Sequence, residues 1–127
     1  MASCEVIYMA NIMIADDSDA IRLVLKDILA IGKHTVVAEA TNGNDAVNLF
    51  FESAPDLLLL DLAMPKKDGL TVLKEIIEKN PKAKVVLITA SDDQKIINQC
   101  LEIGASSYIS KPFDFKEVLN QINETLN

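Results

Sequence analysis

The stretch Leu57-Leu58-Leu59-Leu60-Asp61 decides the fold of this 127-residue chain. Four consecutive leucines after Pro55 fit a strand that is covered on both faces, because a strand exposed on one face would alternate apolar and polar residues. The apolar run then stops at a carboxylate. Open parallel α/β sheets bind their ligands at the carboxyl ends of the strands, which makes Asp61 a candidate site residue. Taken by itself, Asp61 fits equally well a carboxylate that merely ends a strand and caps a turn.

Strand-like and helix-like segments alternate along the whole chain on both sides of this run. The other strand-like apolar runs are 12–15, 35–38, 85–88 and 108–109. Apolar residues at helical spacing follow within 21–29, 46–50, 70–77, 96–101 and 115–126. Five strand-then-helix units predict an α/β fold with a doubly wound five-stranded parallel sheet. At this length the expected strand order is 2-1-3-4-5, the flavodoxin-like three-layer sandwich.

Local signals mark several of the predicted boundaries. Gly32 and Gly104 fit helix stops, and Asn42-Gly43 fits a turn. Ser91 and Gln94 have the spacing of a capping box, as do Asp114 and Glu117.

Composition limits the classes of partner. The chain has 19 acidic and 12 basic residues and a net charge of −7, so nucleic acid and anionic membranes are poor partners. No apolar stretch reaches the roughly 20 residues that span a bilayer, and the N-terminus lacks the pattern of a secretion signal. Cys4 and Cys100 are too few for a disulfide framework or a metal cluster. We expect a cytoplasmic protein with a short lead over 1–10 and a single domain over 11–127.

Polar residues follow four of the five predicted strands. They are Asp16-Asp17, Asp61, Thr89 and Lys111. Parallel strands bring their carboxyl ends to one edge of the sheet, where three crowded carboxylates either raise a pKa or recruit a cation such as Mg²⁺. Taken singly, these residues have simpler interpretations. Asp16-Asp17 fits an acidic helix N-terminus, Thr89 an ordinary strand end and Lys111 a solvated loop lysine. Together they predict a site for a cation and a phosphoryl group.

The motifs around these residues resemble the receiver domains of two-component response regulators. They are Asp16-Asp17, Leu60-Asp61-Leu62-Ala63-Met64-Pro65, Asp68-Gly69, Thr89-Ala90-Ser91 and Tyr108-Ile109-Ser110-Lys111-Pro112-Phe113. The resemblance extends from Asn11 to about Leu126. It implies a phosphorylation switch, in which Asp61 takes a phosphoryl group from the phosphohistidine of a sensor kinase.

The same resemblance implies roles for the neighbouring residues. Mg²⁺ (or Mn²⁺) would be held by Asp17, Asp61 and the carbonyl of Ala63, with Asp16 acting partly through water. Lys111, the Thr89 hydroxyl and the N–H groups of Ala63 and Ala90 would bind the phosphoryl oxygens. Thr89 and Tyr108 would move as the switch, the bond before Pro112 would be cis, and Lys95, Gln99 and Tyr108 would lie on the partner surface.

The resemblance also implies the biological setting. A stand-alone receiver, monomeric or weakly dimeric, would be a signalling domain that assists its own phosphotransfer and dephosphorylation. Its partners would be a sensor histidine kinase or histidine phosphotransfer domain and a downstream protein, in a chemotaxis-like pathway.

Other functions remain as alternatives to this one. They are a phosphorelay intermediate, a Mg²⁺-dependent aspartyl-phosphate phosphohydrolase and an unphosphorylated interaction module. A flavin carrier is disfavoured by the acidic residues after the first strand. His34, the only histidine, is expected to be structural or solvated.

Overall fold

The computed structural model describes residues 9–90 and 94–127; Cys4 and Ser91, with its predicted capping box, lie outside the described residues. The strands are β1 (Asn11–Ala15), β2 (Thr35–Ala40), β3 (Leu57–Asp61), β4 (Val85–Thr89) and β5 (Ser107–Ser110). The helices are α1 (Asp19–Ile31), α2 (Gly43–Ser53), α3 (Gly69–Lys79), α4 (Gln94–Ile103) and α5 (Phe115–Leu126). Strand and helix alternate along the chain, as the sequence pattern predicts.

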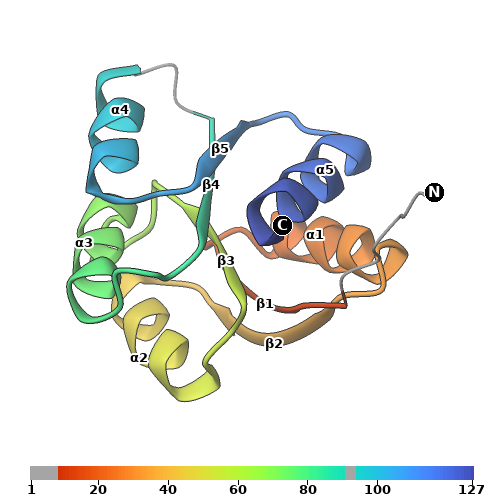
Figure 1. Cartoon of the computed structure of the whole chain (residues 1–127), viewed down its shortest axis with the longest axis horizontal. Coiled ribbons are helices and arrows are strands. Elements are labelled where there is room, and N and C mark those ends of the chain that lie inside the picture. The colour runs from red at the N-terminus through yellow and green to blue at the C-terminus, as the bar shows by residue number, and fades with distance from the viewer. Residues whose placement is uncertain (1–8, 91–93) are drawn as a thin grey trace.

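All strand pairs are parallel, and their order is β2-β1-β3-β4-β5. The predicted fold class and strand order are therefore confirmed. Figure 1 shows α1 and α5 together on one side of the sheet and α2, α3 and α4 on the other. The central strand β3 has a neighbouring strand on each side and helices over both faces, which explains its continuous run of leucines.

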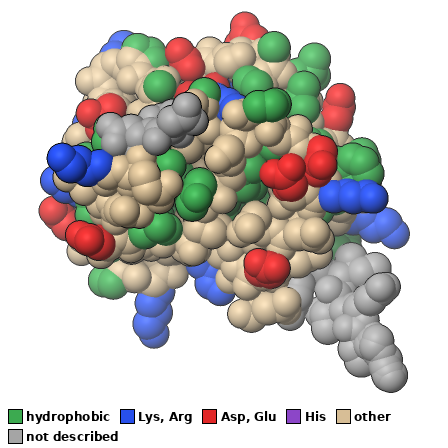
Figure 2. Space-filling view, turned by 90° about the horizontal axis from the view of Figure 1, so that it is seen from above, with side chains coloured by type: hydrophobic (Ala, Val, Ile, Leu, Met, Phe, Trp, Pro, Cys, Tyr) green, Lys and Arg blue, Asp and Glu red, His purple; other side chains and the backbone are tan. Residues whose placement is uncertain are grey.

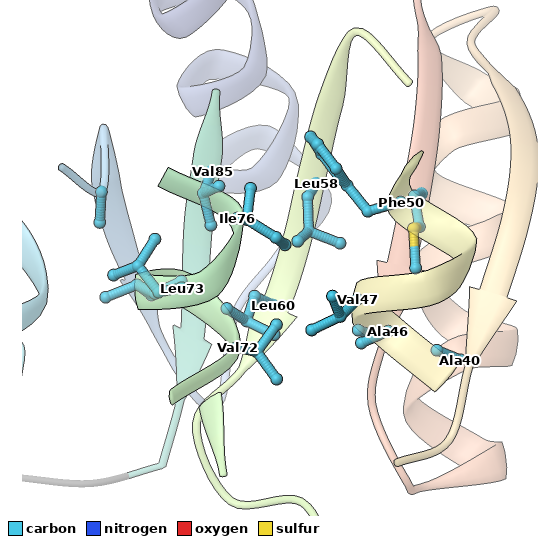
Figure 3. Packing of buried hydrophobic residues seen from close by; sticks show 14 of the residues in the cluster. Ala40, Ala46, Val47, Phe50, Leu58, Leu60, Val72, Leu73, Ile76 and Val85 are labelled. Atoms are coloured by element: carbon cyan, nitrogen blue, oxygen red, sulfur yellow. The ribbon is translucent and has the colours of Figure 1, made fainter. Parts of the chain in front are cut away.

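The leucines of β3 divide between two apolar cores. Leu58 and Leu60 belong to the core beneath α2 and α3, where Phe50 and Ile76 pack close to them (Figure 3). Leu57 and Leu59 belong to the core beneath α1 and α5. Side chains alternate between the two faces of a strand, so one apolar run anchors helices to both sides of the sheet.

The predicted turn at Asn42-Gly43 acts differently in the structure, whereas Gly32 ends α1 as predicted. Asn42 is the N-cap of α2 and accepts a hydrogen bond from the N–H of Asp45, so Asn42-Gly43 opens a helix and is not a separate turn. Gly32 does cap α1, but with φ −80°, and the left-handed residue is Lys33. A Cβ at Gly32 would lie 2.5 Å from Cδ2 of Leu119, so the glycine permits close packing with α5.

The surface carries scattered charges and single apolar side chains. Figure 2 shows Lys and Arg side chains distributed around the face drawn, among acidic and apolar ones. Within residues 9–90 and 94–127, no helix combines the length and the apolar character needed to cross a bilayer.

His34 is a buried histidine at the amino-terminal end of the sheet. Its Nδ1 accepts a hydrogen bond of 3.1 Å from the N–H of Ala10, which requires that this nitrogen carry no proton. Burial lowers the pKa of His34 below its ordinary value of 6.5. The ring therefore has a structural position, away from the polar strand ends.

This burial predicts a pH dependence of stability. The unfolded chain binds the His34 proton more readily than the folded chain does, because the folded pKa is lowered. The free energy of unfolding is expected to fall as the pH drops below 6.5 and to level off below the folded pKa. Asn can accept the same hydrogen bond without titrating, so His34→Asn should remove this part of the pH dependence. Urea unfolding at pH values on both sides of 6.5 tests this. If the free energy of unfolding changes equally with pH in the two proteins, the prediction is contradicted.

Candidate functional site

The polar strand ends meet at one edge of the sheet. Asp61 and Thr89 are the last residues of β3 and β4, and Asp16 and Lys111 directly follow β1 and β5. The parallel register pairs Asp61 with Ile88 and Thr89 with Ser110, so these ends lie at the same level. A cavity of about 470 Å³ opens at this edge. Its lining residues are Asp17, Asp61, Leu62, Ala63, Asp68, Leu70, Thr89, Ala90, Ile96 and Lys111.

Three carboxylates form the acidic part of the site. Asp16, Asp17 and Asp61 each offer one oxygen, and these oxygens lie within 4.8 Å of one another. Asp16 and Asp61 are buried, with 1% and 5% of their surface exposed, whereas Asp17 is exposed. Burial raises the pKa of Asp61, and the nearby charge of Asp16 raises it further. The structure thus assembles the three carboxylates that the sequence placed at the strand ends.

Lys111 is the cation that faces this cluster. Its Nζ lies 3.2 Å from Oδ2 of Asp16 and 3.6 Å from Oδ1 of Asp61. The charge of Lys111 opposes the rise in the pKa of Asp61, as does the N–H of Ala63, which donates to Asp61 Oδ1 at 3.3 Å. Among the described residues, the one ammonium within 4 Å of these carboxylates is that of Lys111, so the cluster keeps an excess of negative charge. Such a set of hard oxygen donors fits a small divalent cation such as Mg²⁺ or Mn²⁺.

The remaining residues predicted for the site differ in their relation to the cavity. Thr89 is buried and lines the cavity with Ala63 and Ala90. The Lys111–Pro112 peptide bond is cis. Tyr108, on β5, is 36% exposed and is not among the residues that line this cavity.

Two glycines support the loop between β3 and α3, which carries Ala63. The N–H of Gly69 donates to the carbonyl of Leu62 at 3.0 Å, and a Cβ on Gly69 would lie 2.6 Å from Cα of Leu62. The N–H of Gly43, in the first turn of α2, donates to the carbonyl of Pro65 at 3.3 Å. Sequence reasoning missed this second contact, because Asn42-Gly43 fits an ordinary turn.

Gly43→Ala is expected to destabilise the protein. A Cβ at this position would overlap the backbone carbonyl of Lys67, which cannot move without displacing the β3–α3 loop. Overpacking of this kind costs roughly 1–3 kcal/mol. Alanine itself favours a helix over glycine by about 1 kcal/mol, so a net loss would come from the contact. Urea unfolding measures the change, with the exposed neighbour Asn44→Ala as the control; equal stability of the two variants would contradict the prediction.

Known proteins share both this sequence pattern and this fold. The profile of the response regulator receiver domain matches residues 12–123. The chemotaxis protein CheY of Bacillus subtilis is 41% identical over 117 residues, which cover 92% of this chain and 98% of that protein. CheY of Thermotoga maritima is 34% identical over 114 residues, covering 90% and 95%. A chain of the CheX–CheY–BeF3–Mg complex from Borrelia burgdorferi matches with a TM-score of 0.89 and 31% identity, over 92% of this chain and 89% of that one.

Proposed function

Because this chain belongs to the family of response regulator receiver domains, we propose that Asp61 is its phosphoryl acceptor. Receiver domains are signalling domains, so the output is a change of conformation and binding. One observation carries the assignment. The carboxylate of Asp61 is buried at the edge of the cavity, beside two other carboxylates and within 3.6 Å of the Lys111 ammonium.

The proposed reaction transfers a phosphoryl group from a phosphohistidine of the donor protein. A carboxylate oxygen of Asp61 attacks the phosphorus, and the new O–P bond forms as the P–N bond breaks. The electron pair of the broken bond stays on the imidazole nitrogen, which takes up a proton. Positioning and charge neutralisation dominate such transfers, so a small site suffices. Later hydrolysis of the acyl phosphate releases phosphate and restores the carboxylate.

The donor set suits Mg²⁺ or Mn²⁺ as the cofactor. Asp16, Asp17, Asp61 and the carbonyl of Ala63 would hold the ion, in keeping with the excess negative charge at this edge. When bound, the ion supplies positive charge that neutralises the phosphoryl oxygens. The Mg in the matching Borrelia burgdorferi complex supports this choice.

Lys111 and the cavity wall would bind the transferred group. The Lys111 ammonium would pair with one phosphoryl oxygen, and the N–H groups of Ala63 and Ala90 would donate to others. The new group adds a charge of about −1.5 to −2. It would draw the Thr89 hydroxyl towards it and allow Tyr108 to turn inward from its half-exposed position.

The proposed output is altered binding of a partner protein. Lys95 and Gln99 are exposed on α4, and Tyr108 is half-exposed on β5. Because β5 pairs with β4, which ends at Thr89, a surface formed by these residues would respond to a movement of Thr89. The donor would be a sensor histidine kinase or a histidine phosphotransfer domain, and the receiver a monomer or weak dimer in the cytoplasm. The CheY relatives favour a chemotaxis-like pathway. The position two residues after Asp61 is Ala63, which offers no general acid for a phosphohydrolase.

Intact mass spectrometry tests the function. The wild-type chain is incubated with acetyl phosphate, with and without Mg²⁺, and the mass is followed over time. We expect one phosphoryl adduct per chain, dependent on Mg²⁺ and lost on standing. Absence of an adduct with acetyl phosphate, phosphoramidate and a phosphohistidine donor would overturn the proposal. Sustained turnover of a small phosphate ester would favour a phosphohydrolase instead.

A further inference from the structure

Arg22, on α1, connects three parts of the molecule next to the acidic cluster. Its Nη1 donates to the backbone carbonyl of Asp16 at 2.9 Å, and its Nε donates to Oε1 of Glu39 on β2 at 3.2 Å. Its Nη2 pairs with Asp19 in the first turn of α1. Only 13% of the Arg22 side chain is exposed. The side chain is thus largely covered, and a guanidinium with three hydrogen-bonded partners holds them in a definite geometry.

The carbonyl that Arg22 binds belongs to the peptide between Asp16 and Asp17. A peptide unit is planar, so a hydrogen bond to its carbonyl also fixes the direction in which the chain enters Asp17. The side chain of Asp16 is held independently, because Oδ1 accepts from the N–H of Ser18 at 2.9 Å and Oδ2 from Lys111. The exposed carboxylate of Asp17 makes no hydrogen bond within residues 9–90 and 94–127. Its position therefore depends on its backbone.

We propose that Arg22 is a positioning residue for the divalent cation, acting through the Asp16 carbonyl to place the carboxylate of Asp17. The inference rests on the proposed function, since it takes the three carboxylates as the cation site. Partners outside the coordination sphere that orient ligands typically change metal affinity by about 10- to 100-fold when they are removed. For Arg22→Ala we expect Mg²⁺ to bind about tenfold more weakly.

The direction in which the Mg²⁺ affinity changes distinguishes this positioning role from a simple effect of the Arg22 charge. Removing a positive charge near three carboxylates makes the cluster more negative, so Coulomb attraction alone would strengthen Mg²⁺ binding. Positioning predicts the opposite. Arg22→Lys keeps the charge but loses the planar fork, so it should also weaken binding. Lys26→Ala is the matched control: Lys26 also lies on α1 and pairs with Glu39 at 3.2 Å, but it does not contact the Asp16 carbonyl.

The experiment is a Mg²⁺ titration of the full chain, followed by the NMR amide shifts of Asp17 and Ser18. Far-UV circular dichroism checks that each variant is folded. Weaker binding in both Arg22 variants, unchanged binding in Lys26→Ala, and phosphorylation restored at saturating Mg²⁺ are the expected results. Unchanged or tighter binding in Arg22→Ala or Arg22→Lys would overturn the inference while leaving Asp61 as acceptor. A wild-type chain that binds no Mg²⁺ would instead overturn the proposed cation site, and this inference with it.

Discussion

Asp61→Asn is expected to abolish the phosphoryl adduct completely. The amide oxygen of asparagine is uncharged and a poor nucleophile, whereas its size and shape match those of the aspartate that it replaces. Loss of the adduct would therefore reflect lost chemistry in an intact site. Intact mass after incubation with acetyl phosphate and Mg²⁺ measures the loss of the adduct.

Asp68→Asn is a matched control, because Asp68 lines the same cavity and asparagine can still cap α3 as Asp68 does. An adduct that survives in Asp61→Asn would mean that another residue is the acceptor.

The same substitution should stabilise the fold in Mg²⁺-free solution. Burial and the charge of Asp16 raise the pKa of Asp61 above its ordinary value, so the folded protein carries its ionised form at a cost. That cost is present when the pH is above the folded pKa and disappears as the pH falls below the unfolded pKa. The Asp61→Asn variant carries no charge at this position, so its advantage over wild type should be largest at neutral pH and should shrink in acid. Added Mg²⁺ should narrow the gap, because it stabilises only the folded wild type. Urea unfolding of both proteins at neutral and acidic pH measures the difference, and a wild type that is the more stable protein at neutral pH without Mg²⁺ would contradict the prediction.

Lys111→Ala is expected to slow formation of the adduct by about 100-fold at saturating Mg²⁺. Among the described residues, Lys111 carries the ammonium that lies within 4 Å of both Asp16 and Asp61, so its removal takes away the cation next to the proposed acceptor. The developing charge on the phosphoryl oxygens would then lose a preorganised partner. The rate is measured by quenching the reaction at a series of times and determining the intact mass of each sample.

Lys116→Ala is the control for this prediction, since Lys116 is an exposed lysine of α5, five residues after Lys111. Its rate should equal that of the wild type. A Lys111→Ala protein that remains folded and is phosphorylated at the wild-type rate would contradict the assigned role. Lys111→Arg should retain part of the rate, because the charge is kept although the geometry of the donor changes.

The sequence predicts the fold because each strand and helix carries its own local pattern. The leucines of β3 indicate a central buried strand, and the alternation of short apolar runs with helical spacing indicates a parallel sheet. Asp16, Asp61, Thr89 and Lys111 could be assigned to one edge because parallel strands place their carboxyl ends together. These assignments need only the order of the elements.

The supporting contacts could not be predicted in the same way. Arg22 lies on an amphipathic helix, where it fits a solvated cation; its contact with Glu39 depends on how α1 lies against β2. Gly43 packs against Lys67, which lies far along the chain, and no local pattern marks this approach. Both depend on distances between elements that the order of elements alone does not determine.

Chemical mapping of the acceptor tests the central proposal most directly. The chain is phosphorylated with acetyl phosphate and Mg²⁺, then treated with borohydride, which reduces an acyl phosphate to an alcohol. Peptide mapping by tandem mass spectrometry locates the product. We expect homoserine in place of Asp61 and unmodified Asp16, Asp17 and Asp68. A reduced residue at another position, or a phosphoryl group that resists borohydride, would contradict the account.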